Sequence, residues 1–282
     1  MLSKSKYFFK LYYIAKERYY GSQRQDDVLT IENTVIDTLR ERKYLNKVKG
    51  AEFEFASRTD RYVSARGAVF SFIPNKTPIL MEINSFLPEE IGVWAYSKVP
   101  LDYSPRFDAL SRHYRYIIPV RLSHLRQKYD FNLKLFKKAS AQLEGTHDFQ
   151  NFSKRDNSIE NTERSLEKVV VHVIDDMIII DFISQAFLRQ QIRRMVQKLL
   201  EIGKKVISYD DFLNLFDASK FVSHQPANPE GLILWEINYD SQVRFQTDEK
   251  SVERMKKYFF LEKQKNWLQY KLFSCLQQDD FS

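Results

Sequence analysis

The sequence predicts an α+β protein organised around β-sheets. Segments with strand and helix patterns come in mixed runs rather than in the regular alternation of a doubly wound fold. Two apolar, β-branched runs flank Asp175 and Asp176, as the strands of a hairpin flank a tight turn. The chain has 282 residues, of which 43% are hydrophobic, and this length suits one large domain or two modest ones.

The first part of the chain predicts a strand, a capped helix and two more strands. Residues 7–13 are apolar and aromatic except for Lys10, which is typical of a strand. Thr30 is a suitable N-cap for a helix. In order, the predicted elements are a strand at 7–13, the helix that begins after Thr30, strands at 52–55 and 68–73, and a short helix at 80–87.

The remainder predicts a second group of strands and helices, followed by a tail. The predicted elements are a strand at 113–118, a helix at 133–143, strands at 168–174 and 177–183, a helix at 186–202 with Gly203 as its C′ residue, a short helix at 209–216 and a strand at 232–239. From about Asp240 charged residues and Gln become frequent, and we expect a helical extension. The expected boundaries are 1–103, 104–240 and 241–282.

Composition narrows the classes of function. Lys and Arg number 44 against 37 Asp and Glu, a net charge of +7, and 15% of residues are aromatic, which fits a nucleic-acid partner through phosphate contacts and base stacking. Neither a G-x-G-x-x-G nor a G-x-x-x-x-G-K stretch is present, so a Rossmann dinucleotide site and a P-loop are not expected.

Cysteine and apolar runs indicate the compartment. Cys275 is the only cysteine, so no disulfide within the chain and no multi-cysteine metal site is possible. The five His show no paired metal-ligand spacing, and no apolar run approaches the length of a membrane span. We therefore expect a cytoplasmic protein without a metal.

Three segments carry residues suited to chemistry. Asp60 follows Arg58 and Thr59 in a turn; a carboxylate held by a cation can act as nucleophile or base, although Asp is more often simply a turn residue. Arg112, Tyr114 and Tyr116 lie in a predicted strand, where two Tyr on one face either stack a base or pack into the core.

The third segment, 187–196, has helical spacing of its apolar residues. Arg189 and Arg193 are four residues apart on one shoulder of that apolar stripe, which predicts either an Arg delivered to a site or a solvated basic face. His147 lies in a polar segment, 145–152, and is expected in a turn or as a cap.

Taken in order, these segments resemble the tRNA pseudouridine synthase A family. The resemblance runs from residue 7 to residue 239. The matching stretches are 19–25 (Y-x-G-x-Q-x-Q), 58–60 (R-T-D), 112–116 (R-x-Y-x-Y), 145–152 (G-x-H-D-F-x-x-F), 187–193 (F-L-x-x-x-(V/I)-R) and 230–232 (E-G-L). Several ordered matches are far more specific than any single one.

The resemblance implies a fold and a reaction. The fold is the pseudouridine synthase fold: two similar subdomains with mostly antiparallel sheets and helices packed on them, forming a central basic cleft. The reaction is the isomerisation of uridine to pseudouridine in the anticodon stem-loop of tRNA, at positions near 38–40, by a homodimer with no metal and no cofactor.

The resemblance also assigns roles. Asp60 matches the catalytic aspartate, Arg193 its arginine partner and Tyr114 the tyrosine that stacks on the target base. The residues expected to bind the substrate RNA are Arg58, Arg61, Arg112, Tyr116, Arg189 and His147.

One departure and two alternatives remain. Arg61 and Tyr62 stand where the family typically has Ala and Gly, and Tyr62 is strained if the turn requires a positive φ. One alternative is a catalytically inactive RNA-binding protein of the same fold. The other is a glycosidase in which Asp60 pairs with a second carboxylate such as Asp181 or Glu230.

Overall fold

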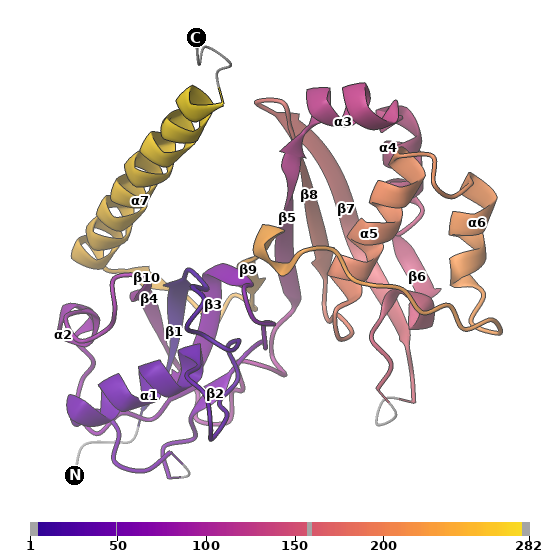
Figure 1. Ribbon diagram of the computed structural model, residues 1–282. Coiled ribbons are helices and arrows are strands. Elements are labelled where there is room, and N and C mark those ends of the chain that lie inside the picture. The colour runs from indigo at the N-terminus through magenta and orange to yellow at the C-terminus, as the bar shows by residue number, and fades with distance from the viewer. Residues whose placement is uncertain (1–4, 49, 157–159, 278–282) are drawn as a thin grey trace.

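The computed structural model describes residues 5–48, 50–156 and 160–277. Within these ranges ten strands form one sheet in the order β10-β4-β1-β3-β9-β5-β8-β7-β6, with β2 paired to β3 (Figure 1). The strands are β1 (Lys6–Tyr13), β2 (Glu54–Phe55), β3 (Ser64–Phe72), β4 (Ile91–Val99), β5 (Ser111–Arg121), β6 (Gly145–Asp148), β7 (Glu163–Ile174), β8 (Met177–Ser184), β9 (Leu232–Asn238) and β10 (Gln246–Thr247).

Helices accompany each half of the sheet. They are α1 (Ile31–Glu41), α2 (Leu80–Asn84), α3 (Leu122–Tyr129), α4 (Leu133–Ala141), α5 (Gln191–Gly203), α6 (Tyr209–Leu213) and α7 (Glu249–Leu276), with single 3₁₀ turns at Gln150–Phe152, Asn214–Phe216 and Pro229–Gly231. In Figure 1, α1 and α2 accompany β1 to β4, and α3 to α6 accompany β5 to β8. This arrangement confirms the predicted α+β class and is consistent with the pseudouridine synthase fold.

The two halves are joined by β9. It runs parallel to β3, with Ser64 opposite Ile233, and antiparallel to β5, with Tyr116 opposite Leu232. The other pairings in the sheet are antiparallel. The sheet therefore runs without a break from the N-terminal half to the second half. Because β3 and β9 are parallel, the loops that precede these two strands lie close to one another.

Most predicted elements are present, with shifted ends. Thr30 caps α1 by accepting a hydrogen bond from the backbone N–H of Asn33. The predicted hairpin exists, and Asp175 and Asp176 at its turn both have positive φ (50° and 63°), as a tight two-residue turn requires. The strand 52–55 is shorter than expected, because only Glu54 and Phe55 pair.

Two helix predictions need correction. Helix α5 begins at Gln191 rather than at 186, so Arg189 lies in the preceding turn and does not share a helical face with Arg193. Gly203 is the last helical residue rather than a left-handed C′ residue. Its role is close packing: a Cβ there would lie 2.3 Å from the Phe131 ring.

Strands β4, β6 and β10 and helix α3 lie outside the sequence predictions. Strand β4 is buried along most of its length, so its sequence lacks the alternation of a half-exposed strand. Strand β6 occupies the segment expected to be a polar turn, because 145–148 pairs with β7 at the sheet edge. Helix α3 has low apolar content and follows β5 without a break.

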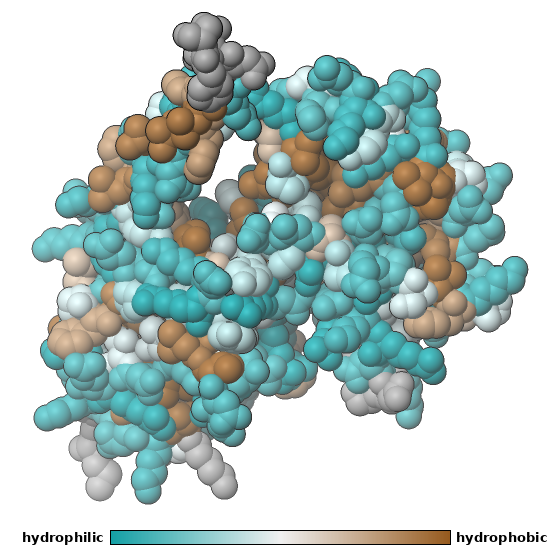
Figure 2. Space-filling model, in the orientation of Figure 1, coloured by the Kyte–Doolittle hydropathy of each residue, from teal (hydrophilic) through white to brown (hydrophobic). Residues whose placement is uncertain are grey.

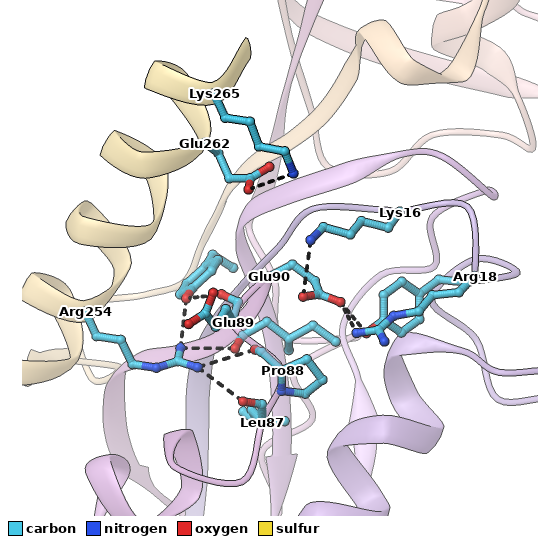
Figure 3. Close-up of polar contacts among 12 residues, drawn as sticks. Lys16, Arg18, Leu87, Pro88, Glu89, Glu90, Arg254, Glu262 and Lys265 are labelled. Atoms are coloured by element: carbon cyan, nitrogen blue, oxygen red, sulfur yellow. Dashed lines mark hydrogen bonds and ion pairs between the residues drawn. The ribbon is translucent and has the colours of Figure 1, made fainter. Parts of the chain in front are cut away.

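Helix α7 confirms the helical character of the tail, and β10 adds a short strand before it. Arg254 fixes the base of the helix: its guanidinium donates to the Tyr12 hydroxyl (2.9 Å) and to the carbonyls of Ile91, Leu87 and Pro88 (Figure 3). Tyr12, Trp94 and Tyr258 form a small apolar cluster beside it. Beyond this base the helix projects away from the sheet (Figure 1).

Candidate active site

Asp60 lies in the loop between β2 and β3, and neighbouring segments hold that loop at its buried Thr59. The Ser22 hydroxyl accepts a hydrogen bond from the Thr59 N–H (2.7 Å), and the Ser22 N–H donates to the Thr59 carbonyl (3.1 Å). The Tyr13 and Thr59 hydroxyls are 2.8 Å apart. Gly21 has φ +93°, and a Cβ there would lie 3.0 Å from the Thr59 carbonyl.

The supporting 19–22 segment is itself held by a buried carboxylate. Glu90 is 4% exposed, accepts a hydrogen bond from the Tyr19 hydroxyl (3.0 Å) and pairs with Arg18 and Lys16 (Figure 3). Burial raises the pKa of Glu90, but hydrogen bonds from its own backbone, Tyr19 and Arg18 outweigh burial and lower it. Glu90 therefore stabilises the segment as a carboxylate.

Arg193 forms an ion pair with Asp60. Its Nη1 lies 2.7 Å from Asp60 Oδ2, and its Nε donates to the Ala227 carbonyl (2.8 Å). The Arg193 side chain is 10% exposed, whereas that of Asp60 is 36% exposed. The pair joins the N-terminal half to α5, 133 residues further along the chain, and it leaves the carboxylate accessible.

Tyr114 lies close to this pair on β5. Its side chain is 7% exposed, and its ring meets Phe187 edge-on at 5.3 Å between centroids. Burial raises the pKa of Tyr114; Arg112 and a hydrogen bond with Ser57 act against the rise, and the nearby Asp60 adds to it. The hydroxyl is therefore neutral at ordinary pH.

The two other predicted residues of this strand are engaged within the protein. Tyr116 is 1% exposed and donates to the Asn228 carbonyl (2.8 Å). Arg112 donates to the Ser57 hydroxyl (2.8 Å) and to the carbonyls of Ala56, Arg106 and Gln185. Both residues thus brace the segments around the Asp60 loop.

Arg61 and Tyr62, the two residues after Asp60, form a stacked group with Tyr20. The Arg61 guanidinium lies 3.9 Å from the Tyr20 ring centroid and 4.8 Å from that of Tyr62, and it donates to the Glu17 carbonyl (3.0 Å). Tyr62 has φ 68°, in the left-handed region. The strain expected from a Tyr at the family's glycine position is therefore present.

The remaining predicted residues lie at different places. Arg58 is exposed and makes no hydrogen bond or ion pair with any residue that the structure describes. Arg189 is exposed in the turn before α5. His147 is on the edge strand β6, where its ring packs on Phe216 (4.5 Å) and its Nε2 lies 2.9 Å from the Glu144 carbonyl.

Asp181 does not support the glycosidase alternative. It is opposite Arg115 in the β5–β8 pairing, on the sheet face away from Tyr114, and it binds Arg115 through both oxygens (2.8 and 3.0 Å). Its position and its pairing with Arg115 thus exclude Asp181 as a second carboxylate beside Asp60. Across the described residues, no three His, Cys, Asp or Glu side chains gather as a metal site.

Sequence comparison with known proteins identifies the family. Residues 139–240 match the family profile described as tRNA pseudouridine synthase. The chain is 35% identical over 236 residues to the tRNA pseudouridine synthase A of Methanothermobacter thermautotrophicus, covering 84% of this chain and 82% of that relative. This chain belongs to the tRNA pseudouridine synthase A family.

Other relatives agree. The tRNA pseudouridine synthase A of Methanosarcina mazei is 36% identical over 248 residues, with 87% of this chain and 88% of the relative covered. That of Pyrococcus furiosus is 32% identical, with 85% and 86% covered. The predicted family, and with it the enzyme class of an isomerase, is confirmed.

Three contributors to the site escaped the sequence prediction. Ser57 contacts both Arg112 and Tyr114, Ala227 offers its carbonyl to Arg193, and Ser22 supports Thr59. Ser22 lies inside the stretch 19–25 that carries the resemblance, so a signal for it existed. Ser57 and Ala227 act through single polar atoms whose partners are far away in sequence, and no local pattern marks them.

Proposed function

We propose that this protein isomerises uridine to pseudouridine in the anticodon stem-loop of tRNA, with Asp60 as the catalytic residue. The observation that carries the proposal is the ion pair of a partly exposed Asp60 with a buried Arg193. Both residues lie in stretches that match the family's motifs; Asp60 comes from the loop between β2 and β3, and Arg193 comes from α5.

The reaction breaks the N1–C1′ bond of uridine and forms a C5–C1′ bond. C5 loses its proton and N1 gains a proton, so no atom is lost overall. Asp60 begins it at the ribose, either by bonding to C1′ or by accepting a ribose proton. Arg193 holds the carboxylate in place. The ribose is transferred from N1 to C5 of the same base, so the transfer is intramolecular, and no redox step is needed.

Access to the base requires that the uridine leave its stack. Tyr114 and Phe187 pack edge-on to form an aromatic wall close to Asp60, and we propose that the flipped ring packs against the accessible part of this wall. Arg58, exposed and unpaired among the described residues, supplies a phosphate contact beside it. Arg112 and Tyr116 contribute by bracing this wall.

Affinity for tRNA is expected to arise mainly from Lys and Arg contacts with phosphates, and so to fall steeply with salt. Because the substrate is tRNA, the proposal places the protein in the cytoplasm. The structure shows no helix with the length and apolar character of a membrane span in its described ranges.

We also propose that the protein is a homodimer that associates through α7. The outer part of this helix exposes large apolar side chains, 49–69% accessible, and brown surface is visible over the helix in Figure 2. These side chains are Phe260, Leu261, Trp267, Leu268, Tyr270, Leu272, Phe273 and Leu276. Four of them, Leu261, Leu268, Leu272 and Leu276, are spaced by seven, four and four residues and so lie on one face of the helix, where a second copy can pack against them. In light scattering, Leu268→Asp should give monomers and the matched Gln269→Asp should not; a monomeric wild type would overturn this part.

The isomerisation assay tests the main proposal. Unmodified tRNA transcripts are incubated with the full-length protein, and pseudouridine is mapped by position. Pseudouridine in the anticodon stem-loop, lost when those uridines are replaced by cytidine, supports the proposal. Product elsewhere in the tRNA would contradict the assignment of the stem-loop, and no product on any tRNA would contradict the reaction.

A further inference from the structure

A groove of about 330 Å³ lies beside the turn that leads into α5. Four segments line it: the 150–156 region, Thr162 before β7, the 188–189 turn and the loop that precedes β9. The lining residues that matter here are Gln150, Lys154, Arg155, Asp156, Arg189 and Phe221. Of these, only Arg189 belongs to the substrate-binding residues expected from the sequence.

The walls of this groove are fixed by buried polar contacts. Asn151 is 1% exposed, and its amide donates to the carbonyls of Leu215, Asp217 and Lys220 while its oxygen accepts from the Val222 N–H. The loop bearing Phe221 is thereby clamped to the 150–152 turn. The second wall is tied by the Lys154 N–H, which donates to the Arg189 carbonyl (2.8 Å).

The groove joins positive charge to an exposed aromatic ring. Lys154, Arg155 and Arg189 are exposed cations, and Asp156 is the one carboxylate among the lining residues. Phe221 is 48% exposed, and the Arg155 guanidinium lies 5.5 Å from its ring centroid. Cations bind phosphate, and an exposed ring stacks on a base of any identity.

The groove is also continuous with the candidate active site. Arg189 is four residues before Arg193 along the chain, and Leu188, which lines the groove, follows Phe187, the ring against Tyr114. The loop with Phe221 continues to Ala227, whose N–H and carbonyl both bond to Arg193. The N-terminus of α5 lies at this junction, and its dipole adds to the attraction for phosphate.

We propose that this groove binds a single-stranded nucleotide next to the target uridine, with its phosphate on Lys154, Arg155 and Arg189 and its base on Phe221. This rests on the proposed function, because it assumes that RNA enters the Asp60 site. It adds a neighbouring subsite that reads no base identity and holds the strand while the uridine is displaced.

Binding of tRNA to full-length variants tests the proposal. Phe221→Ala should weaken the Kd about tenfold, since one stacked base is lost. Lys154→Gln and Arg155→Gln should each lower the slope of log Kd against log salt by about 0.7 per lost phosphate contact. The matched controls are Phe86→Ala, which removes a ring similarly covered by Arg42 (4.2 Å), and Lys137→Gln, an exposed lysine on α4.

The outcomes separate the subsite from the reaction. Weaker binding by the groove variants, with both controls near wild type and unchanged thermal unfolding, supports the subsite. Wild-type affinity in Phe221→Ala, Lys154→Gln and Arg155→Gln would overturn it even if pseudouridine is formed. Weaker binding together with no pseudouridine from the wild type would leave the groove standing as an RNA site and remove the proposed reaction.

Discussion

A loop and the start of a helix meet at the candidate active site, and they hold their side chains differently. The loop 57–63 brings Asp60 with its side chain 36% exposed, and the segment 187–193 brings Arg193 with 10% exposed. Each contains a residue other than glycine at positive φ, Tyr62 (68°) and Gln190 (59°). Both segments therefore contain a backbone conformation that their own residues do not favour.

The two side chains differ in how many of their polar atoms are bonded within the protein. Arg193 is fixed at Nε by the Ala227 carbonyl and at Nη1 by Asp60, whereas Asp60 is held mainly through the backbone of its neighbour Thr59. The carboxylate that we propose to meet the substrate is left accessible, and its counter-charge is immobilised. The residue fixed at two atoms therefore belongs to α5, and the more accessible one belongs to the loop.

The largest effect is expected from Arg193→Gln, which removes the immobile charge. Turnover of tRNA should fall about 100-fold, the loss typical of a removed electrostatic contact in a catalytic site. The matched control is Arg194→Gln, since Arg194 is equally buried (9%) but donates to the His224 carbonyl instead. Equal losses of single-turnover rate in the two variants would contradict the different roles assigned to Arg193 and Arg194.

Ser22→Ala should loosen the Asp60 loop. It leaves the buried Thr59 N–H without its acceptor, which should cost about 1–2 kcal/mol of unfolding free energy. Urea denaturation measures this, with Ser241→Ala, an exposed residue, as control. Turnover should fall less than in Arg193→Gln; a variant as stable as wild type would show that Ser22 does not support the loop.

The unfolding free energy is expected to depend on pH through Glu90, which holds the segment that supports the Asp60 loop. Its pKa in the folded protein lies below the ordinary 4.5, so its stabilisation is complete above pH 4.5 and is lost as the pH falls through the folded value. The difference in unfolding free energy between wild type and Glu90→Gln should therefore shrink below pH 4.5. A difference that stays constant from pH 7 to pH 3 would contradict this role.

The smallest effect is expected from Tyr62→Gly. Glycine relieves a left-handed cost of about 1 kcal/mol, but it removes a ring stacked on Arg61 and adds freedom to the unfolded chain. The net change in unfolding free energy should lie within about 1 kcal/mol of zero. Thermal unfolding of Tyr62→Gly and Tyr62→Asn measures it, and a shift beyond about 2 kcal/mol would mean that Tyr62 has a further structural role.

Local sequence signals predicted more of the fold than of the site. Thr30 as a cap and the turn at Asp175 depend on neighbours in sequence, and both predictions hold. Strand β4 was missed because burial on both faces removes alternation, and the start of α5 was misplaced because 186–190 continues its apolar pattern without helical backbone. The Asp60–Arg193 contact spans 133 residues, and only the family resemblance pointed to it.

The most direct test of the account compares wild type with Asp60→Asn on the same unmodified tRNA, at protein concentrations above the Kd. The substitution keeps the size of the side chain and removes its charge. The account predicts that single-turnover pseudouridine formation falls by at least about 10³-fold while the Kd for tRNA changes little. Formation of pseudouridine by Asp60→Asn within tenfold of the wild-type rate would contradict it.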